Sequence, residues 1–416
     1  MLIAPLLAAI DDVVGHRPPE RMAVAVSGGG DSIALLSAMA RYTIDRRIEL
    51  HVITVDHGLR PEFRHEVAVV TSLCQKLGLQ HHLEFWSGWD GAGNMQAEAR
   101  EGRYALMADW AYAQQIDHIA VAHTADDQAE TFLMRLARSA GVDGLSAMAP
   151  RTVHHGITWL RPFLGTRRDE LRLYLQAAGL KWVDDPSNRN RDFERVRVRD
   201  ALIVLETLGI GVDALADVSS HMKQAREALD WQAFLVARDL IRIEAGAIAM
   251  ELNLFRAQPV EIKRRLLIHS LKWLSGRYYP ARRDGVARAL DAISEGRTFT
   301  LEGCQISQND GRIWVYRELN AVADIEVEVG DAWDERWTID GPEDDPDIVV
   351  RALGFEGLSS LDDWRDTGIP RAALAVTPAA WYDDTLICAP LVFPDDEWSA
   401  ELEGGTDGFF AALLSH

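Results

Sequence analysis

A short glycine-rich segment between a predicted strand and a predicted helix is the part of the sequence best suited to hold a ligand. The segment SGGGDS, residues 27–32, follows the apolar run MAVAV at 22–26. Consecutive glycines let the backbone approach a ligand closely, and free N–H groups at the start of a helix attract anions. The segment lacks the Gly-Lys-Ser/Thr of a Walker A loop and the GxGxxG spacing of a dinucleotide-binding fold. It therefore predicts a phosphate site, and an ordinary glycine turn is the alternative.

Strand-like and helix-like patterns alternate around this segment. Short apolar runs at 22–26, 50–55 and 118–122 are separated by stretches with an apolar residue at every third or fourth position. Such alternation is typical of βαβ units, in which a parallel sheet carries helices on both faces. Ligands of these sheets bind beyond the carboxyl ends of the strands, so the segments after the three runs are candidates for the site. Those segments are 27–32, 56–60 and 123–131.

The rest of the chain changes character twice. Residues 158–205 predict a short strand, a helix opened by a capping-box-like Thr166 and Asp169, and then a polar segment. Residues 213–293 predict a separate all-helical unit. From about 297 onward, β-rich alternation broken by Gly and Pro continues to the end of the sequence.

Acidic charge is concentrated in the last segment of the chain. The formal charge is −21, and residues 321–416 alone contribute −19, from 4 Lys+Arg against 23 Asp+Glu. Residues 1–200 and 201–320 are nearly neutral, at −3 and +1. The acidic segment cannot bind RNA by neutralising phosphates, whereas 261–300, with 9 Lys+Arg against 4 acids, is basic enough to meet phosphate. A solvated helical face is the alternative for that basic stretch.

Cysteine usage and apolar patterning exclude several classes of protein. Cys74, Cys304 and Cys388 form no CxxC pair, which argues against a disulfide framework, a zinc ribbon or a cysteine-ligated cluster. The apolar start, residues 1–10, lacks a basic flank and predicts an amphipathic helix, not a signal peptide. No run approaches the roughly 18 apolar residues that a membrane span requires. We expect a cytoplasmic protein without a membrane partner.

The glycine-rich segment resembles the pyrophosphate loop, SGGxDS, of the N-type ATP pyrophosphatases, which cleave ATP between the α and β phosphates. Further motifs follow in the order of one family within that class, the tRNA isoleucine lysidine synthetases. They are DHGLRP at 56–61, EAREGRY at 98–104, AHTADDQAETFLMRLARSAGVDGLSAM at 122–148, RPFLG at 161–165 and DDPSN at 184–188. The resemblance is dense over 1–205 and extends weakly to GRTFTLEG at 296–303. Several independent motifs in one order are much harder to obtain by chance than any one of them.

The resemblance implies an α/β fold, a reaction and its partners. It implies a Rossmann-like parallel-sheet ATP pyrophosphatase domain at 1–205, a mainly helical tRNA-contacting domain at 206–320 and a small acidic β-rich domain at 321–416. In the family, ATP adenylylates the C2 oxygen of the wobble cytidine in a tRNA(Ile) with a CAU anticodon. Free L-lysine then displaces AMP and forms lysidine. ATP and Mg²⁺ are the implied cofactors, no set of protein metal ligands is predicted, and a homodimer is compatible with the sequence.

Site residues carry over from the family position by position. Asp31 would face Mg²⁺ or the departing pyrophosphate, and Arg103, the family's arginine before tyrosine, would stabilise phosphate charge. Asp127 and Glu130 lie one helical turn apart, so both carboxylates point the same way. They would hold the ammonium groups of lysine and accept its proton; the alternatives are a helix cap for these acids and a surface position for Arg103. The predicted catalytic residues are Asp31, Arg103, Asp127 and Glu130, and the predicted nucleotide-binding residues are Ser27, Gly28, Gly29, Gly30, Asp31 and Ser32.

The segment DDPSNRNRDFERVRVRD contains five arginines, of which the four from Arg191 onward are candidates for contact with RNA. Arg195, Arg197 and Arg199 alternate as on a strand face or an extended arm, and Arg191 precedes them. Phosphate contact is the preferred interpretation, since family members use this segment near the anticodon. The alternative is a salt-bridged surface with the neighbouring acids, which are Asp192, Glu194 and Asp200.

Departures from the family pattern leave some positions without a predicted role. Thr124 stands where a second histidine is common, and Val196 stands where asparagine is usual. Asp126 and His123, beside the predicted acids, rank lower as site residues, because a histidine at a strand end is as readily structural. The acidic segment 321–416 matches the family poorly.

Related activities fit the sequence less well. A tRNA thiolase generally needs paired cysteines, and amidation of the kind catalysed by GMP synthetase needs an ammonia source; neither pattern is present. A non-catalytic nucleotide sensor or RNA-binding protein that kept the loop would be expected to have lost one or more of the predicted catalytic residues. All four of them are present.

Overall fold

The structure, a computed structural model, divides into two compact units, one running to Arg226 and the other beginning at Glu227. Of the helices that it describes, none is long and apolar enough to cross a membrane. The side chains of Phe63 and of residues 95–99 are outside the description. The described residues are 2–56, 63–86, 95–184, 191–277, 280–342, 347–361 and 364–414.

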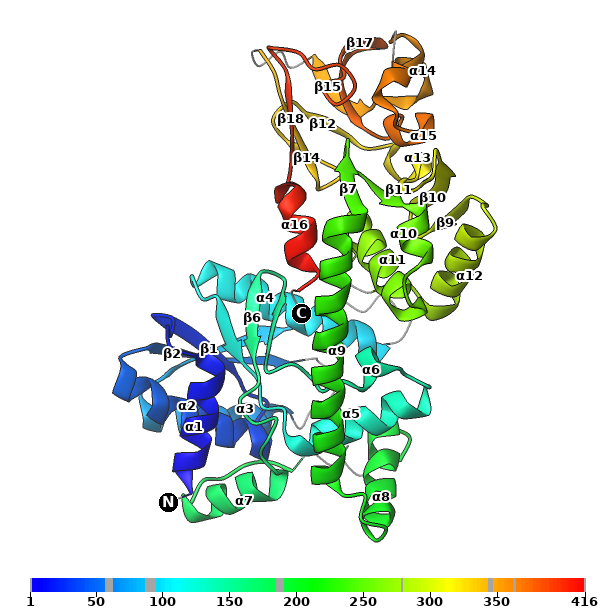
Figure 1. Cartoon of the computed structure of the whole chain (residues 1–416). Coiled ribbons are helices and arrows are strands. Elements are labelled where there is room, and N and C mark those ends of the chain that lie inside the picture. Colours follow the sequence, from blue (N-terminus) through cyan, green and yellow to red (C-terminus); the bar gives the residue numbers. More distant parts are fainter. Residues whose placement is uncertain are drawn as a thin grey trace. The chain divides into compact units, whose positions relative to one another are not determined.

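A six-stranded sheet organises the first unit (Figure 1). Its strand order is β3-β2-β1-β4-β6-β5, and neighbouring strands are parallel except for the antiparallel pair β5 and β6. The predicted parallel sheet is confirmed. The strands are β1 (Arg21–Ala25), β2 (Glu49–Asp56), β3 (Gln80–Phe85), β4 (His118–Ala120), β5 (Arg151–His154) and β6 (Ile157–Leu160).

Helices cover both faces of this sheet. Met22 and Val24 of β1 pack into a core with residues of α1, α2, α3 and α7, whereas Ala23 between them packs into a second core with α4. Successive strand residues point to opposite faces, so this alternation buries both sides of the sheet. The predicted amphipathic helix at the start of the chain is confirmed as α1. The helices of the unit are α1 (Ile3–Val14), α2 (Gly30–Arg46), α3 (Phe63–Leu77), α4 (Met95–Ala113), α5 (Ala125–Ala137), α6 (Val142–Leu145), α7 (Arg168–Ala177) and α8 (Glu194–Glu206).

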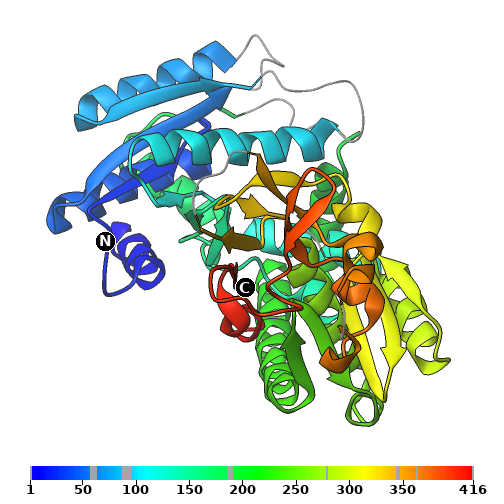
Figure 2. The same cartoon turned by 90° about the horizontal axis from the view of Figure 1, so that it is seen from above.

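A third small core joins α5 and α8 to the start of α9 (Val212–Leu240). Ala129 and Phe132 of α5 pack there with Leu202 of α8 and Leu215 of α9. This packing places the amino-terminal half of α5, which carries the predicted Asp127 and Glu130, beside α8. In Figure 1, α9 runs as one unbroken green helix, and Figure 2 looks nearly along its axis. It begins in the first unit and ends in the second.

The second unit is built on a five-stranded sheet of order β7-β8-β11-β10-β9, with two smaller sheets, β12-β15-β16-β17 and β13-β14-β18. Its strands are β7 (Ile241–Glu244), β8 (Ala247–Glu251), β9 (Phe299–Leu301), β10 (Cys304–Asn309), β11 (Arg312–Arg317), β12 (Glu326–Glu328), β13 (Ala332–Trp333), β14 (Trp337–Asp340), β15 (Ile348–Ala352), β16 (Pro378–Tyr382), β17 (Thr385–Cys388) and β18 (Ser399–Leu402). Its helices are α10 (Leu252–Arg256), α11 (Val260–Ser275), α12 (Arg283–Ser294), α13 (Leu319–Val322), α14 (Gly354–Ser359), α15 (Arg371–Leu374) and α16 (Gly405–Ala412), with a 3₁₀ helix at Trp364–Thr367.

The expectation of an all-helical unit over 213–293 is wrong at 241–251. These residues form the hairpin of β7 and β8, joined by Ala245 and Gly246, whose φ angles of 47° and 72° suit a two-residue turn. The hairpin is the edge of the five-stranded sheet. The predicted β-rich pattern from about 297 is confirmed by the strands from β9 onward.

The central sheet of the second unit also buries both faces. Ile313 and Val315 of β11 face a core with α11, α12 and α16, whereas Trp314 faces a core with Trp333 and Trp337. The second core therefore contains residues from both the expected helical domain, 206–320, and the expected acidic domain, 321–416. Removal of residues 321–416 would strip apolar partners from Trp314, so a truncation there tests folding as well as function.

Acidification is expected to destabilise the second unit through His269. His269 Nε2 of α11 donates to the carbonyl oxygen of Phe409 at 2.8 Å, and burial lowers the pKa of its imidazole to about 4. The unfolded chain, with a pKa near 6.5, binds more protons below that pH, so stability falls as pH drops from 7 to 5. This one group accounts for about 2 kcal/mol of that loss. Urea titrations at both pH values should show a smaller loss for His269→Gln; an equal loss would contradict the assignment.

Candidate active site

The glycine-rich segment leaves β1 and enters α2 with its backbone held in a fixed shape. Ser32 Oγ donates to the carbonyl oxygen of Gly29 at 2.9 Å and accepts from the backbone N–H of Ser27 at 3.2 Å. No side chain caps the start of α2 among the described residues, so its first-turn N–H groups are available to a ligand. The loop for which a phosphate site is predicted therefore leads into the amino end of a 17-residue helix.

Gly28 is the residue on which the shape of this loop depends. Its φ angle is +88°, in the region that favours glycine. A Cβ at this position would lie 3.0 Å from Cβ and 3.2 Å from Cα of Glu66, a buried residue of α3. Only a residue without a side chain fits, because both the backbone angle and the neighbouring helix oppose one.

Three carboxylates from two parts of the sequence converge on one guanidinium beside the loop. Arg168, at the first position of α7, contacts Asp31 of α2 at 3.1 Å, Asp127 at 3.3 Å and Glu130 at 3.4 Å. Its backbone N–H also donates to Asp126 Oδ2 at 2.7 Å. The structure therefore brings together three of the four predicted catalytic residues.

Burial and charge set the protonation of this cluster. Burial raises the pKa of Asp31, and the nearby acids add to that rise while Arg168 opposes it. Burial also opposes ionisation of Asp127, yet Arg168, His123 and the backbone N–H of Thr124 together lower its pKa. The cluster is built to surround a cation.

Glu130 is the most enclosed of the acids, with a side chain that is 1% exposed. Arg199 of α8 donates two hydrogen bonds to this carboxylate. Its Nε donates to Oε1 at 2.6 Å, and a terminal nitrogen donates to Oε2 at 3.3 Å. Two guanidiniums thus neutralise a carboxylate that is otherwise too costly to bury.

Asp127 also closes the amino end of α5. Its Oδ2 accepts from the backbone N–H of Thr124 at 2.9 Å, and its own backbone N–H donates to Thr124 Oγ1 at 3.3 Å. The two residues form a capping box, which gives Thr124 a structural role. Asp127 therefore combines the capping role with a place in the carboxylate cluster, and its other oxygen faces Arg168.

Arg103 lies on α4, in a group of cations without an acid partner among the described residues. Its Nε is buried and makes no hydrogen bond there. Burial lowers the pKa of Arg103, and Arg100 and Arg195 lower it further, with Tyr104 opposing them. Burial likewise lowers the pKa of the neighbouring His123. A buried cation held near others needs an anion, which is the environment expected at a phosphate.

Several known proteins are similar to this chain in sequence. A tRNA(Ile)-lysidine synthase of Ruegeria pomeroyi is 47% identical, with 99% of this chain and all of that one covered. The chain belongs to the tRNA(Ile)-lysidine synthase family. Residues 5–206 match the family described as the PP-loop domain. Synthases of the same name from Wolbachia pipientis, 34% identical over 76% of each chain, and Hyphomonas neptunium, 36% identical over 73% of this chain and 84% of that one, are also similar.

Membership of the lysidine synthase family confirms the resemblance inferred from the motifs and makes the chain an ATP-binding enzyme of the PP-loop class. Parts of those motifs lie outside the described residues. These parts are residues 57–61 of DHGLRP and residues 185–188 of DDPSN, and the side chain of Glu98 is likewise not described. Asp56 ends β2, and its carbonyl oxygen accepts from the N–H of Trp86 at 2.8 Å.

In this lysidine synthase family member, the arginine-rich segment is a helix. The expectation of a strand face or extended arm for Arg195, Arg197 and Arg199 is wrong, because all three lie on α8. Residues four apart share a helix face, so Arg199 and Arg195 point one way and Arg197 another. Arg197 donates to the carbonyl oxygens of residues 191 and 192, both at 2.9 Å. The Arg191 side chain contacts Asp200 at 2.9 Å, as the surface alternative expected.

Arg168 was not predicted as a site residue, although the sequence offered a signal. Arg167 and Arg168 stand at the amino end of α7, where the helix dipole disfavours cations. Cations at this end of a helix are therefore favourable only where carboxylates from other parts of the chain pair with them. The capping pair predicted there is also wrong by one residue, since Glu170 Oε2 accepts from the backbone N–H of Arg167 at 2.8 Å.

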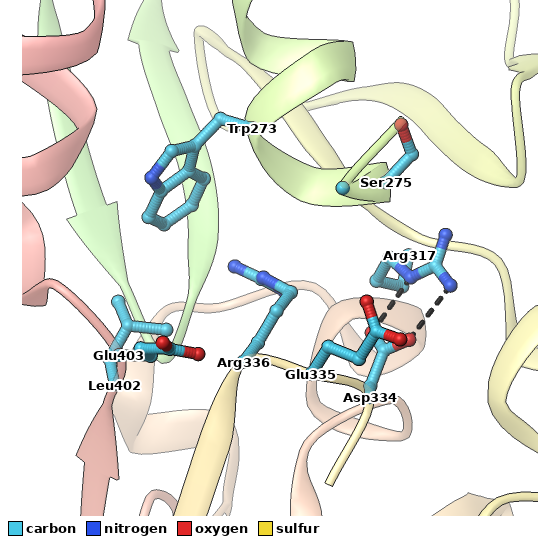
Figure 3. A pocket seen from close by; sticks show the side chains of 9 residues that line it. Trp273, Ser275, Arg317, Asp334, Glu335, Arg336, Leu402 and Glu403 are labelled. Carbon is cyan, nitrogen blue, oxygen red and sulfur yellow. Dashed lines mark hydrogen bonds and ion pairs between the residues drawn. The ribbon is translucent and has the colours of Figure 1, made fainter. Parts of the chain in front are cut away.

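The second unit holds a separate cavity of about 390 Å³ (Figure 3). Arg317 lines it but is engaged by both oxygens of Asp334 at 2.8 Å. Arg336 lies 4.7 Å from the ring centre of Trp273 and donates to the carbonyl oxygen of Gly246 at 3.1 Å. None of the predicted site residues lines this cavity.

Proposed function

We propose that this member of the family joins free L-lysine to C2 of the wobble cytidine in a tRNA(Ile) with a CAU anticodon. ATP first transfers AMP to the C2 oxygen, releasing pyrophosphate. The side-chain amine of lysine then attacks C2, AMP leaves with that oxygen, and lysidine forms. The observation that carries the proposal is the convergence of Asp31, Asp127 and Glu130 on Arg168 beside the glycine loop.

The loop would hold the pyrophosphate portion of ATP. Its helix N-terminus offers N–H donors without an internal cap, and the narrow space at Gly28 fixes their direction. Asp31, in the first turn of α2, is the residue that would face a Mg²⁺ ion on the phosphates, and Mg²⁺ would neutralise charge on the departing group. Arg103 would meet phosphate charge through its unpartnered Nε.

The carboxylates of α5 would serve the second step. The lysine substrate carries ammonium groups, and Asp127 and Glu130 already surround a guanidinium of the same charge. Held there, the side-chain ammonium must lose a proton before its nitrogen can attack C2, and one of the two carboxylates would accept it. Arg199 would keep Glu130 in place during that transfer.

Sulfur transfer to tRNA, the nearest alternative, finds little support. Cys74, Cys304 and Cys388 are all buried and free. Burial raises the pKa of each thiol to about 11, so none is a reactive thiolate at neutral pH.

The proposal is tested by incubating the full chain with ATP, Mg²⁺, labelled lysine and a tRNA(Ile) transcript bearing CAU. Digestion of the product to nucleosides should give one lysine-bearing cytidine per tRNA. A transcript whose wobble base is U serves as the control and should remain unlabelled. Label in both transcripts, or in neither, would contradict the proposed acceptor.

Glu130→Gln is expected to separate the two steps. It preserves the shape of the side chain but removes the charge that faces lysine, so lysine incorporation should fall by about 10²- to 10⁴-fold while transfer of AMP to tRNA continues. Radiolabelled AMP transfer and lysine incorporation are measured separately. The matched control is Glu194→Gln, because Glu194 of α8 pairs with Arg138 on an exposed surface at 2.5 Å. Lysine incorporation by Glu130→Gln at the rate of the unmodified chain would remove Glu130 from this step.

A further inference from the structure

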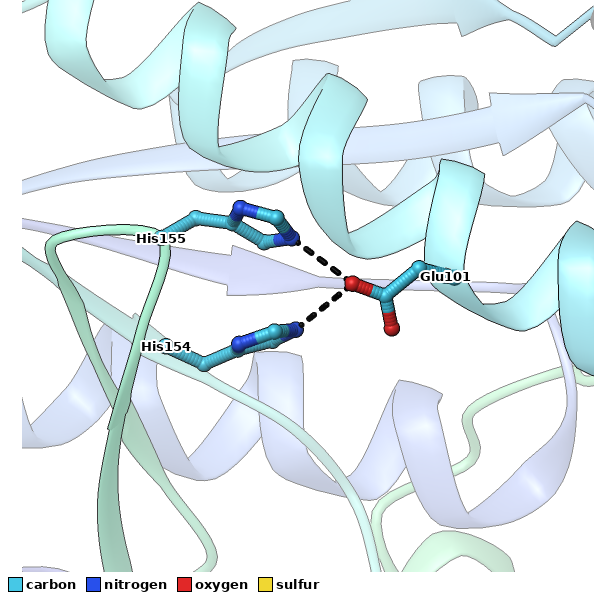
Figure 4. A group of neighbouring side chains, drawn as sticks. All are labelled: Glu101, His154 and His155. Carbon is cyan, nitrogen blue, oxygen red and sulfur yellow. Dashed lines mark hydrogen bonds and ion pairs between the residues drawn. The ribbon is translucent and has the colours of Figure 1, made fainter. Parts of the chain in front are cut away.

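A second group of polar side chains lies between α4 and the hairpin of β5 and β6 (Figure 4). Glu101 Oε1 accepts from His154 Nε2 at 3.1 Å and from His155 Nε2 at 2.9 Å. The three ligand atoms lie within 4.8 Å of one another. As Figure 4 shows, both imidazoles point at the same carboxylate oxygen. The mechanism proposed above makes no use of this group.

The hairpin turn is what places two consecutive histidines on one carboxylate. Successive residues of a strand point to opposite faces, so an uninterrupted strand would separate them. Here His154 ends β5, and His155 and Gly156 form a two-residue turn with φ angles of 50° and 71°. Asn-Gly is the sequence that such a turn prefers. A histidine at its first position places its imidazole against Glu101 of α4.

The donor set and its spacing suit a transition-metal ion. Two imidazole nitrogens and one carboxylate oxygen form a common ligand set for Zn²⁺, whereas Mg²⁺ and Ca²⁺ prefer oxygen ligands alone. Metal–nitrogen bonds of about 2.05 Å in a tetrahedron separate neighbouring ligand atoms by about 3.3 Å. The two nitrogen–oxygen distances, 3.1 and 2.9 Å, are close to that value.

The exposure of the three side chains also favours binding. The side chains of His154, His155 and Glu101 are 11%, 38% and 40% exposed, so an ion can enter from solvent and still be partly enclosed.

We propose that Glu101, His154 and His155 bind a divalent transition-metal ion, with Zn²⁺ as the chemical candidate. The three side chains leave at least one coordination position for water. The ion would fasten the β5–β6 hairpin to the middle of α4, where Tyr104 packs against the His154 ring at 5.9 Å between centroids. It would thereby stabilise the helix that carries Arg103. This site is independent of the proposed reaction.

Zinc titration of the full metal-free chain, in competition with a chromophoric chelator, tests the proposal. One Zn²⁺ should bind per chain, and saturation should raise the thermal unfolding midpoint, because the ion binds only the folded state. With Co²⁺ in place of Zn²⁺, visible absorption bands of a four- or five-coordinate site should appear. Binding should weaken in acidic buffer, because protons compete with the metal for imidazole nitrogen.

His155→Asn is the most informative variant. Asparagine suits the turn, so the metal-free variant should be at least as stable as the unmodified chain while its zinc affinity falls by at least about tenfold. Glu101→Gln, which keeps the shape of the side chain, should weaken binding as well. His118→Gln is the matched control, since His118 Nδ1 contacts Asp117 at 2.6 Å without a second imidazole. Zinc binding that is absent from the unmodified chain, or equal in His155→Asn, would overturn the proposal.

Discussion

Gly28→Ala is expected to lower kcat/KM for ATP by at least about a hundredfold, with little effect on the affinity of the enzyme for tRNA. Gly28 has a φ of +88°, and an added Cβ would lie 3.0 Å from Cβ of Glu66. Relief of this contact requires the loop to move away from α3. The N–H groups of the cradle would then no longer point at the position of the pyrophosphate. ATP-dependent pyrophosphate release at several ATP concentrations measures the change.

A substitution at a second glycine separates the effect of backbone strain from the effect of the contact with Glu66. Gly78, between α3 and β3, has a φ of +68°, and nothing lies within 4 Å of a Cβ added there. Gly78→Ala should therefore lower stability by about 1 kcal/mol without affecting the use of ATP. Equal loss of activity in both variants would mean that general strain, and not the loop's contact with a nucleotide, explains the result for Gly28.

Arg168→Ala is expected to abolish measurable ligation and to lower the free energy of unfolding of the first unit by about 3 kcal/mol. The substitution leaves Asp31, Asp127 and Glu130 facing one another without the cation that now lies among them. Mutual repulsion should raise their pKa values and disturb the start of α5. Urea unfolding and lysine incorporation are the two measurements.

The neighbouring arginine provides the control for this variant. Arg167 contacts Asp213 at 3.1 Å, but that pair is exposed to solvent, so Arg167→Ala should change stability by less than about 1 kcal/mol. Arg168→Lys should restore part of the stability, because a single ammonium keeps the charge but cannot reach three carboxylates in the manner of a guanidinium. If Arg168→Ala were as stable and as active as Arg167→Ala, the carboxylate cluster would have no role in the enzyme.

Local patterns predicted the parts of the site that depend on neighbouring residues. The spacing of Asp127 and Glu130 predicted a shared helix face, and both contact Arg168. The glycines at 27–32 predicted an open helix end, and α2 begins there without a side-chain cap. In each case a period of 3.6 residues, or the turn preferences of glycine, was sufficient information.

Contacts between distant parts of the chain could not be predicted in this way. Arg168 is 137 positions from Asp31, and nothing local to either residue records the contact. The alternation of Arg and Val over 195–199 favoured a strand, but Val198 and Leu202, four residues apart, both pack against the core that α5 and α8 share, which is the spacing of one helix face. The helix in turn carries Arg199 to Glu130. Tertiary packing thus determines the secondary structure of this segment and the contacts of Arg168 and Arg199, which sequence periodicity did not predict.

The central claim is that the glycine loop holds the pyrophosphate that leaves ATP while a tRNA base receives AMP. Release of pyrophosphate from ATP by the purified full chain tests it most directly, with lysine and the CAU-bearing tRNA(Ile) supplied separately and together. We predict a single turnover of pyrophosphate when tRNA is present without lysine, continuous release when both are present, and none without tRNA. Continuous release with lysine but no tRNA would contradict the account.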